Sequence, residues 1–315
     1  MKILRIIIAL SFLFLVIFFV RKIFDDFYPV DHSLVESMIE EKRIDDANRY
    51  LDSKIEKYSD DGLLYYERAK VFVLKKDYNK ALSDLDRSIS LGFPLVSSYN
   101  LKAVIYGNMG DYKKQMELAQ KAIENDPTDW EGYLIRARAY FYMNDYKKSL
   151  KDYDTAYRIE NDDDILLEKA DVLLKDDNPD KAIELLLSLN RKYPQNPSVM
   201  YKLFIAYKLK GYYNNALYLI SELYNIKKDL FYLREKIKLL YEMGDYYYSA
   251  SESYKLLTST SSQENDYYLH SILMYKNLKF DEASKYLDIL EKKYPENKKK
   301  YFELKKKILI QKRMG

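Results

Sequence analysis

The sequence predicts an all-α protein built as a solenoid of repeated helix pairs, and the main support is a fixed spacing. Only 8 Gly and 7 Pro occur among 315 residues, which favours helices joined by short turns. A constant period between about 20 and 50 residues is typical of stacked supersecondary units. Here the period is 34 residues, and it relates Asp77-Tyr78, Asp111-Tyr112 and Asp145-Tyr146, as well as Tyr65, Tyr99 and Tyr133.

The first helix of each predicted pair carries a bulky residue, then a small residue, then an aromatic residue. The spacing puts all three on one face of a helix. The small residue is expected where the first helix crosses the second, because a larger side chain would hold the two backbones apart. The three sets are Tyr65, Ala69 and Phe72, then Tyr99, Ala103 and Tyr106, then Tyr133, Ala137 and Tyr140.

The second helix of each pair supplies its own small residue and begins at a capping residue. Gln115 breaks the small-residue pattern in the third repeat. Aspartates before the second helix are expected to cap it, and glycines before them to adopt the left-handed conformation. Tyr78, Tyr112 and Tyr146 then serve as packing anchors. The small residues are Ala47, Ala81, Ser149, Ala182, Ala216, Ser249 and Ala283; the caps are Asp77, Asp111, Asp145 and Asp245; the glycines are Gly110, Gly211 and Gly244.

Together these residues resemble the tetratricopeptide repeat family over roughly residues 28–296. The resemblance implies a right-handed α-α superhelix. We expect about eight repeats within residues 32–296, starting near 28, 62, 96, 130, 163, 197, 230 and 264, followed by a basic capping helix at 297–315. The first repeat is degenerate. Bulkier residues at the crossing from repeat six onwards predict a change in superhelical pitch near residues 160–200.

The amino terminus has the composition of a membrane span. Ile6 to Val20 contains no charged residue, and Arg5 and Lys22 can reach the headgroups on either side. We expect an uncleaved transmembrane signal-anchor at 1–24, with lipid contact through residues 3–24, and a short linker at 25–31. A cleaved signal peptide is the alternative, although no A-x-A-like site follows. A slight excess of basic residues before the span favours repeats on the extracytoplasmic side.

The sequence contains no enzyme signature. There is no P-loop, G-x-G-x-x-G, H-E-x-x-H or nucleophile elbow. The chain has no Cys, which excludes disulfides and thiol catalysis, and its two histidines, His32 and His270, have no partner at metal-ligand spacing. We therefore expect no catalytic residue, no cofactor and no metal site.

The family resemblance implies a concave groove, lined by first-helix side chains, that binds a partner protein or peptide. No three consecutive repeats carry the family's Lys-Asn-Asn-Lys-Arg carboxylate clamp. Mixed Tyr, Arg and Lys is the composition that binding hot spots favour. The expected function is a non-enzymatic, membrane-tethered interaction scaffold. The candidate groove residues are Tyr66, Lys70, Asn100, Arg138, Tyr142, Asp171, Tyr201, Lys208, Arg234, Lys238, Tyr268 and Tyr275.

An alternative function rests on the basic carboxyl end. The net charge is only +3, yet the last 25 residues hold ten Lys or Arg against Glu291, Glu296 and Glu303. In this alternative the signal peptide is removed, and the secreted or periplasmic protein engages a polyanion or envelope component through that end. Nucleic acid is not expected as a partner. The other interpretation is a polar-faced helix that caps the solenoid.

Overall fold

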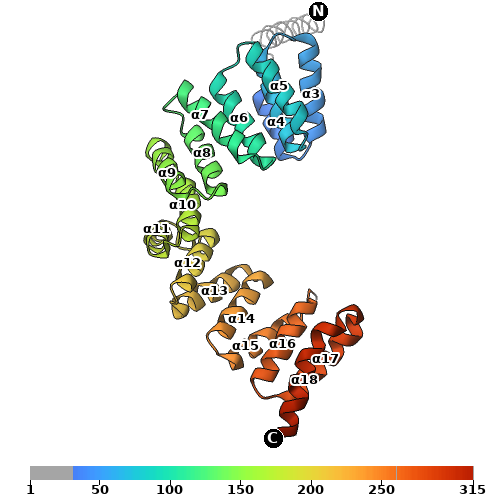
Figure 1. Cartoon of the computed structure of the whole chain (residues 1–315). Helices are drawn as coiled ribbons and strands as arrows, with labels where there is room; N and C mark the ends of the chain where they lie inside the picture. Colours follow the sequence, from blue (N-terminus) through green and yellow to red (C-terminus); the bar gives the residue numbers. More distant parts are fainter. Residues whose placement is uncertain (1–30, 260, 315) are drawn as a thin grey trace, which may run out of the picture. The chain divides into compact units, whose positions relative to one another are not determined.

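The structure is a computed structural model that describes residues 31–259 and 261–314, and this part of the chain is helical without strands (Figure 1). Successive helices form antiparallel pairs joined by short turns. The pairs are α2 (His32–Glu40) with α3 (Ile44–Lys57), α4 (Gly62–Leu74) with α5 (Tyr78–Ser90), α6 (Leu95–Asn108) with α7 (Tyr112–Asn125), α8 (Trp130–Tyr142) with α9 (Tyr146–Glu160), α10 (Asp163–Lys175) with α11 (Pro179–Lys192), α12 (Pro197–Leu209) with α13 (Tyr213–Lys227), α14 (Leu230–Glu242) with α15 (Tyr246–Leu257), and α16 (Glu264–Lys276) with α17 (Phe280–Lys293). A short 3₁₀ turn (Pro295–Asn297) and a final helix, α18 (Lys298–Met314), follow.

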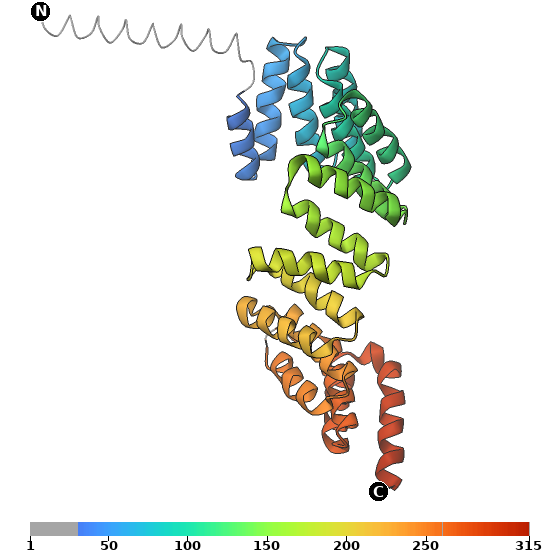
Figure 2. The same ribbon diagram turned by 90° about the vertical axis from the view of Figure 1, so that its left-hand side faces the viewer.

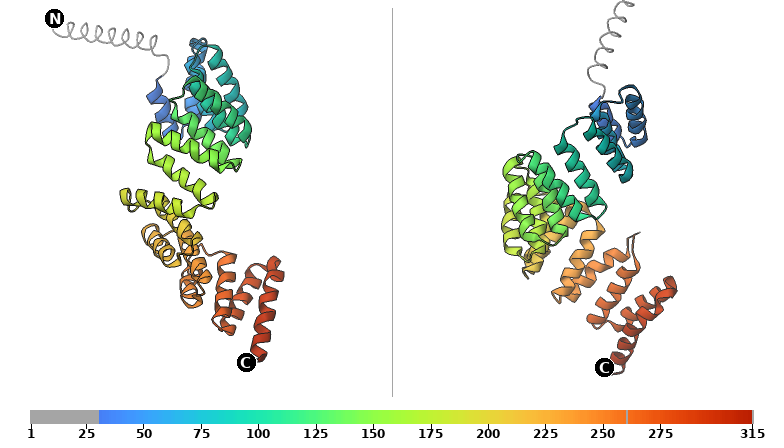
Figure 3. Two further views of the ribbon diagram at one scale, coloured as in Figure 1. Left: turned by 60° about the vertical axis from the view of Figure 1, so that its left-hand side comes forward. Right: turned by 45° about the horizontal axis from the view of Figure 1, so that its top comes forward.

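The chain divides into two compact units, Met1–Ile165 and Leu166–Gly315. Within each unit, the second helix of a pair packs against the first helix of the next, as Figures 2 and 3 show. The boundary falls inside the range in which we predict a change of pitch, and the pitch itself stays a prediction. No helix of the described residues is long and apolar enough to cross a bilayer, and the predicted span lies outside those residues.

Small residues fill the helix crossings. Ala69, Ala103 and Ala137 on the first helices have no exposed surface. The second-helix residues Ser149 and Ser249 are equally buried, and their hydroxyls donate to the carbonyl oxygens of Ala137 and Ile237 at 2.8 and 2.9 Å. A serine can therefore replace alanine at the crossing, because its hydroxyl finds a partner on the paired helix. The alanines at the same place are also fully buried: Ala47, Ala81, Ala182, Ala216 and Ala283.

The exception at Gln115 is explained by the residue opposite it. Gln115 is 6% exposed, and Gly107 of α6 faces its amide. A Cβ atom at position 107 would lie 2.7 Å from Oε1 of Gln115, which is too close for contact. In the third pair, the long side chain of Gln115 on α7 thus lies against a position of α6 that has no side chain.

The turns between paired helices repeat one design. The predicted N-caps are confirmed, because the side chain of Asp111 accepts a hydrogen bond from the amide of Lys114 at 3.0 Å, and Asp77, Asp145 and Asp245 do the same at their own helices. Gly110, Gly211 and Gly244 have φ of 81°, 74° and 79°, as predicted. An aromatic pair then spans the turn at Tyr207–Tyr212, Tyr241–Tyr246 and Tyr275–Phe280, each 34 residues from the last.

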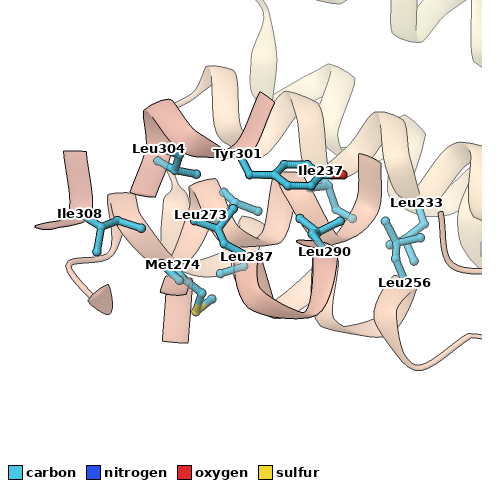
Figure 4. Close-up of a cluster of buried hydrophobic side chains, with 12 residues drawn as sticks. Leu233, Ile237, Leu256, Leu273, Met274, Leu287, Leu290, Tyr301, Leu304 and Ile308 are labelled. Atoms are coloured by element: carbon cyan, nitrogen blue, oxygen red, sulfur yellow. The ribbon is translucent and has the colours of Figure 1, made fainter. Parts of the chain in front are cut away.

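Helix α18 covers the end of the last pair. Tyr301, Leu304 and Ile308 are buried against Leu273, Leu287 and Leu290 (Figure 4). The hydroxyl of Tyr301 donates to Oε1 of Glu264 at 2.9 Å, so the buried phenol has a partner. One face of α18 therefore belongs to the core of the second unit.

Candidate functional site

A pocket in the first unit is formed by the first helices of three consecutive pairs. It encloses about 280 Å³ and brings together three predicted groove residues, Tyr66 of α4, Asn100 of α6 and Arg138 of α8. Trp130 and Glu131 stand at the start of α8 and complete its polar and aromatic wall. The other lining residues are Ser97, Leu101, Val104, Leu134 and Ile135.

Asn100 is fixed by the turn that precedes α8. Its Nδ2 donates to Oδ2 of Asp129 at 2.7 Å, with Oε2 of Glu131 at 3.5 Å. Asp129 is itself the N-cap of α8, accepting from the amide of Gly132 at 3.0 Å. Asn100 is only 4% exposed, and its Oδ1 has no hydrogen-bond partner. A buried amide oxygen left without a donor costs free energy, so a small shift that gives it one is favoured.

Burial raises the pKa of two acidic groups of the pocket, Tyr66 and Glu131. Burial, helped by the charges of Glu67 and Glu131, raises the pKa of Tyr66 to about 12, so its hydroxyl stays protonated and can donate. The Tyr66 ring stacks on Phe93 with centroids 4.5 Å apart. Loss of solvent and the charge of Asp129 raise the pKa of Glu131. The pocket thus offers aromatic walls, an amide, a carboxyl group and a guanidinium, a set suited to a polypeptide segment.

The other predicted residues of the first unit lie outside this pocket. Nζ of Lys70 is 3.0 Å from Oε2 of the buried Glu67, one turn earlier on the same helix. Tyr142 is 57% exposed and stacks on Tyr112, with centroids 4.6 Å apart. Neither side chain lines the pocket formed by α4, α6 and α8.

In the second unit, the predicted basic groove residues form ion pairs within the chain. Nε and Nη2 of Arg234 lie 2.9 and 2.8 Å from the carboxylate of Asp266, which is 4% exposed. Lys208 pairs with Glu242, and Lys238 with Glu235, both at 2.7 Å. Asp171, also predicted to face the groove, accepts from Lys202. The pairs of Arg234, Lys208 and Asp171 join two first helices, and the pair of Lys238 lies within α14.

The predicted tyrosines of the second unit also have neighbours within the chain. Tyr201 lies against Phe204, Phe231 and Tyr232, with ring centroids 5.4 to 5.8 Å apart. Tyr268 packs beside Tyr301 of α18. The remaining aromatic contact, between Tyr275 and Phe280, belongs to the turn already described. The structure therefore brings only three of the predicted groove residues, Tyr66, Asn100 and Arg138, together in one pocket.

A partly buried polar bracket, in which one arginine joins three helices, was not predicted from the sequence. The guanidinium of Arg68 (α4) contacts Asp84 (α5) at 2.7 and 2.8 Å and Asp52 (α3) at 2.8 Å. Two periods later, Arg136 (α8) contacts Asp152 (α9) at 2.6 and 2.8 Å and Gln120 (α7). The sequence does carry a signal for this bracket, because Arg68 and Arg136, and likewise Asp84 and Asp152, are two periods apart. At the same register in the last pair, the ring of His270 lies against Tyr254 and Tyr286.

His270 differs from the other bracket residues because it carries no charge. Burial lowers its pKa to about 4, so it is neutral at physiological pH. Its Nδ1 lies 2.7 Å from Oγ of Ser253, which has no exposed surface and also donates to the carbonyl of Ala250. Ser253 is closed to a substrate, and nothing else among the described residues indicates catalysis.

Comparison with known proteins supports the fold. Residues 96–129 and 134–197 match tetratricopeptide repeat models, so the chain contains these repeats. A tetratricopeptide repeat protein from Parabacteroides merdae is similar with a TM-score of 0.57 and 18% identity, over 79% of this chain and 98% of that one. Yeast Tom70 gives 0.53 and 19%, over 86% and 60%. Pseudomonas aeruginosa pilF gives 0.50 and 17%, over 64% and 92%. Such identities establish the fold alone. No curated protein matches the sequence.

Proposed function

We propose that the protein is a non-enzymatic scaffold that binds an extended segment of a partner protein in the pocket of α4, α6 and α8, and that it does so tethered to a membrane. The observation that carries the first part is the convergence of Tyr66, Asn100 and Arg138 from three successive helices. Each of these side chains can make a directional hydrogen bond. The aromatic walls supply apolar contact around them.

The pocket favours a segment that presents both a backbone and a side chain. The amide of Asn100 and the protonated hydroxyl of Tyr66 can bond a peptide group, which offers one donor and one acceptor. Trp130 and Leu101 provide area for an apolar side chain. A volume of about 280 Å³ accommodates a few residues. The rest of a longer segment lies along α4, α6 and α8 within the first unit.

The tether rests on the sequence of residues 3–24. An apolar stretch of this length can cross a bilayer, and a linker of residues 25–31 keeps the repeats close to the surface. The slight basic excess before the stretch supports repeats on the extracytoplasmic side. The bound partner is then confined to a layer next to the membrane.

The pocket is tested by filling it. Ser97 is a half-buried lining residue at the start of α6, and Ser83 is an exposed residue of α5. A random peptide library is selected against the full chain in detergent, and the selected peptides are measured against Ser97→Trp and Ser83→Trp. We expect Ser97→Trp to weaken binding at least tenfold and Ser83→Trp to leave it unchanged. Equal binding to both variants would show that the peptides bind elsewhere.

The tether is tested in the native host. We expect the full-length chain to stay in the membrane fraction after a high-salt wash and an alkaline carbonate wash, and a chain lacking residues 1–24 to be released. Added protease should digest the repeats only from the extracytoplasmic side. A mature mass that lacks the first 24 or so residues would instead indicate a cleaved signal peptide and a released protein.

A further inference from the structure

The basic residues of α18 fall into two groups that the sequence does not distinguish. Three of them face the last helix pair and form ion pairs with it. Lys300 lies 3.0 Å from Glu264, and Lys305 lies 2.7 Å from Asp288 and 2.8 Å from Glu291. Lys312 pairs with Asp281 at 2.5 Å. Each of these lysines thus has a carboxylate partner within the chain.

The second group is exposed and has no ion pair with any residue of the described ranges. It consists of Lys298, Lys299, Lys306, Lys307 and Arg313. Only Glu303 within the helix opposes these charges. The outward side of α18 is therefore strongly positive. A capping role requires a polar outer side, but it does not require so many unpaired charges of one sign.

Large apolar side chains lie among these cations. Phe302, Leu309 and Ile310 are 60%, 57% and 48% exposed. They follow Lys299 and Lys306 at steps of three or four residues, so they lie on one face of the helix. Tyr301, Leu304 and Ile308, which Figure 4 labels within the buried cluster, lie on the other side of the helix. The exposed face of α18 thus carries basic and large apolar side chains next to each other.

We propose that this exposed face of α18 docks onto a bilayer surface that contains anionic lipids. Such a surface accepts both kinds of side chain: the lipid headgroups neutralise Lys299, Lys306 and Arg313, and the acyl boundary buries Phe302 and Leu309. Nucleic acid would neutralise the cations but leave the aliphatic side chains in water. An apolar protein surface would bury the aliphatic side chains and leave the cations without partners.

The strength of the contact follows from the number of cations. One Lys or Arg near an anionic membrane surface strengthens binding by about fivefold. Removing three of them should therefore weaken binding about 100-fold. The effect is electrostatic over about a Debye length, so added salt should weaken it as well. The structural lysines of the first group are not expected to contribute, because they already have partners.

The test uses the full chain in a phosphatidylcholine nanodisc, which occupies any lipid-binding segment at the amino terminus. Because the chain has no Cys, Glu303→Cys carries a single polarity-sensitive dye on α18, and Tyr218→Cys, at a 66% exposed site of α13, carries the reference dye. Vesicles of phosphatidylcholine alone, or mixed equally with phosphatidylglycerol, are then added. We expect the protein to bind the mixed vesicles and not the phosphatidylcholine vesicles. On binding, the emission of the dye at position 303 should shift to the blue, and that of the dye at position 218 should not change.

Two triple variants decide the cause. Lys299→Gln, Lys306→Gln and Arg313→Gln together should weaken binding to mixed vesicles about 100-fold. The control replaces three exposed lysines of other helices by Gln, with the same change in net charge, and should have little effect: Lys113, Lys147 and Lys181. Circular dichroism verifies that both variants keep their helices.

Three results would overturn the proposal. The first is equal binding to both kinds of vesicle, or equal weakening by both triple variants. The second is binding without any response of the dye at position 303. The third is that the protein binds a labelled oligonucleotide through the three cations but does not bind vesicles. That result would assign this face to nucleic acid. Phe302→Ser with Leu309→Ser should weaken binding to mixed vesicles and leave any oligonucleotide binding unchanged.

Discussion

Breaking the bracket at Arg136 should destabilise the first unit far more than breaking an exposed ion pair. The side chains of Arg136 and Asp152 are only 16% and 5% exposed, and two hydrogen bonds join them. Arg136→Met removes the cation and leaves the carboxylate of Asp152 buried without a counter-charge. Removing one partner of a buried pair costs about 3 to 5 kcal/mol.

Hydrogen exchange measures this cost locally, which suits a repeat array whose unfolding is not a single transition. A loss of about 3 to 5 kcal/mol corresponds to a fall in amide protection of roughly two to four orders of magnitude in α8 and α9. The matched control is Arg43→Met. Arg43 is 51% exposed and pairs with Glu41 and Asp46 at the surface, where the cost should be below about 1 kcal/mol.

The double replacement Arg136→Met with Asp152→Leu separates two explanations. If the cost comes from the stranded carboxylate, the double variant recovers at least the wild-type protection, because apolar residues of similar volume replace both charges. If the pair were favourable in itself, the double variant would stay as unstable as the single one. An Arg136→Met variant with protection within tenfold of wild type would refute the reasoning altogether.

Three further predictions concern single positions. Burial lowers the pKa of His270 to about 4, below its ordinary value near 6.5, so the unfolded chain binds this proton more tightly. This histidine should therefore lower the stability of the last pair in urea by about 3 kcal/mol as pH drops from about 6.5 to 4, and His270→Phe should remove that contribution. Leu278 is 74% exposed with φ of 62°, so Leu278→Gly should stabilise by about 1 kcal/mol. Tyr218→Gly, at a 66% exposed position inside α13, should instead destabilise by a similar amount in the same assay. Gly62→Ala would place a Cβ atom 2.8 Å from the carbonyl oxygen of Ser88, and should cost about 1 to 3 kcal/mol in thermal or urea unfolding.

The sequence was sufficient for the features that depend on local spacing. The helix pairs, the capping aspartates and the left-handed glycines all follow from residues within one turn of each other, and the same rules apply in each repeat that carries the favoured residues. Leu278 shows the limit of such rules. It has the left-handed conformation that Gly244 has one period earlier, so the tertiary structure imposes that conformation without the favoured residue.

Features that depend on several helices could not be predicted in the same way. The groove register placed Arg234 beside Tyr201 as a binding residue, but whether a guanidinium is available depends on a carboxylate 32 residues away. Likewise, the sequence gives no sign that Gly107 makes room for Gln115, since the two residues belong to different helices. Two residues of the pocket in the first unit could be predicted, because Tyr66 and Asn100 occupy the same position in successive repeats and therefore face the same side.

The two units have different chemistry on their first helices, and this difference bears on where a partner binds. Arg234, Lys208 and Lys238 of the second unit, like Lys70 of the first, each pair with a carboxylate of the chain, so a ligand at any of them would have to compete with an existing ion pair. In the first unit, the buried Oδ1 of Asn100 has no partner, and a donor from a ligand would satisfy it after a small shift. A ligand that donates to this oxygen gains a hydrogen bond and breaks none that Oδ1 of Asn100 already makes. The first unit is therefore the better place for a partner segment, and the outward face of α18 leaves the second unit a separate role at an anionic surface.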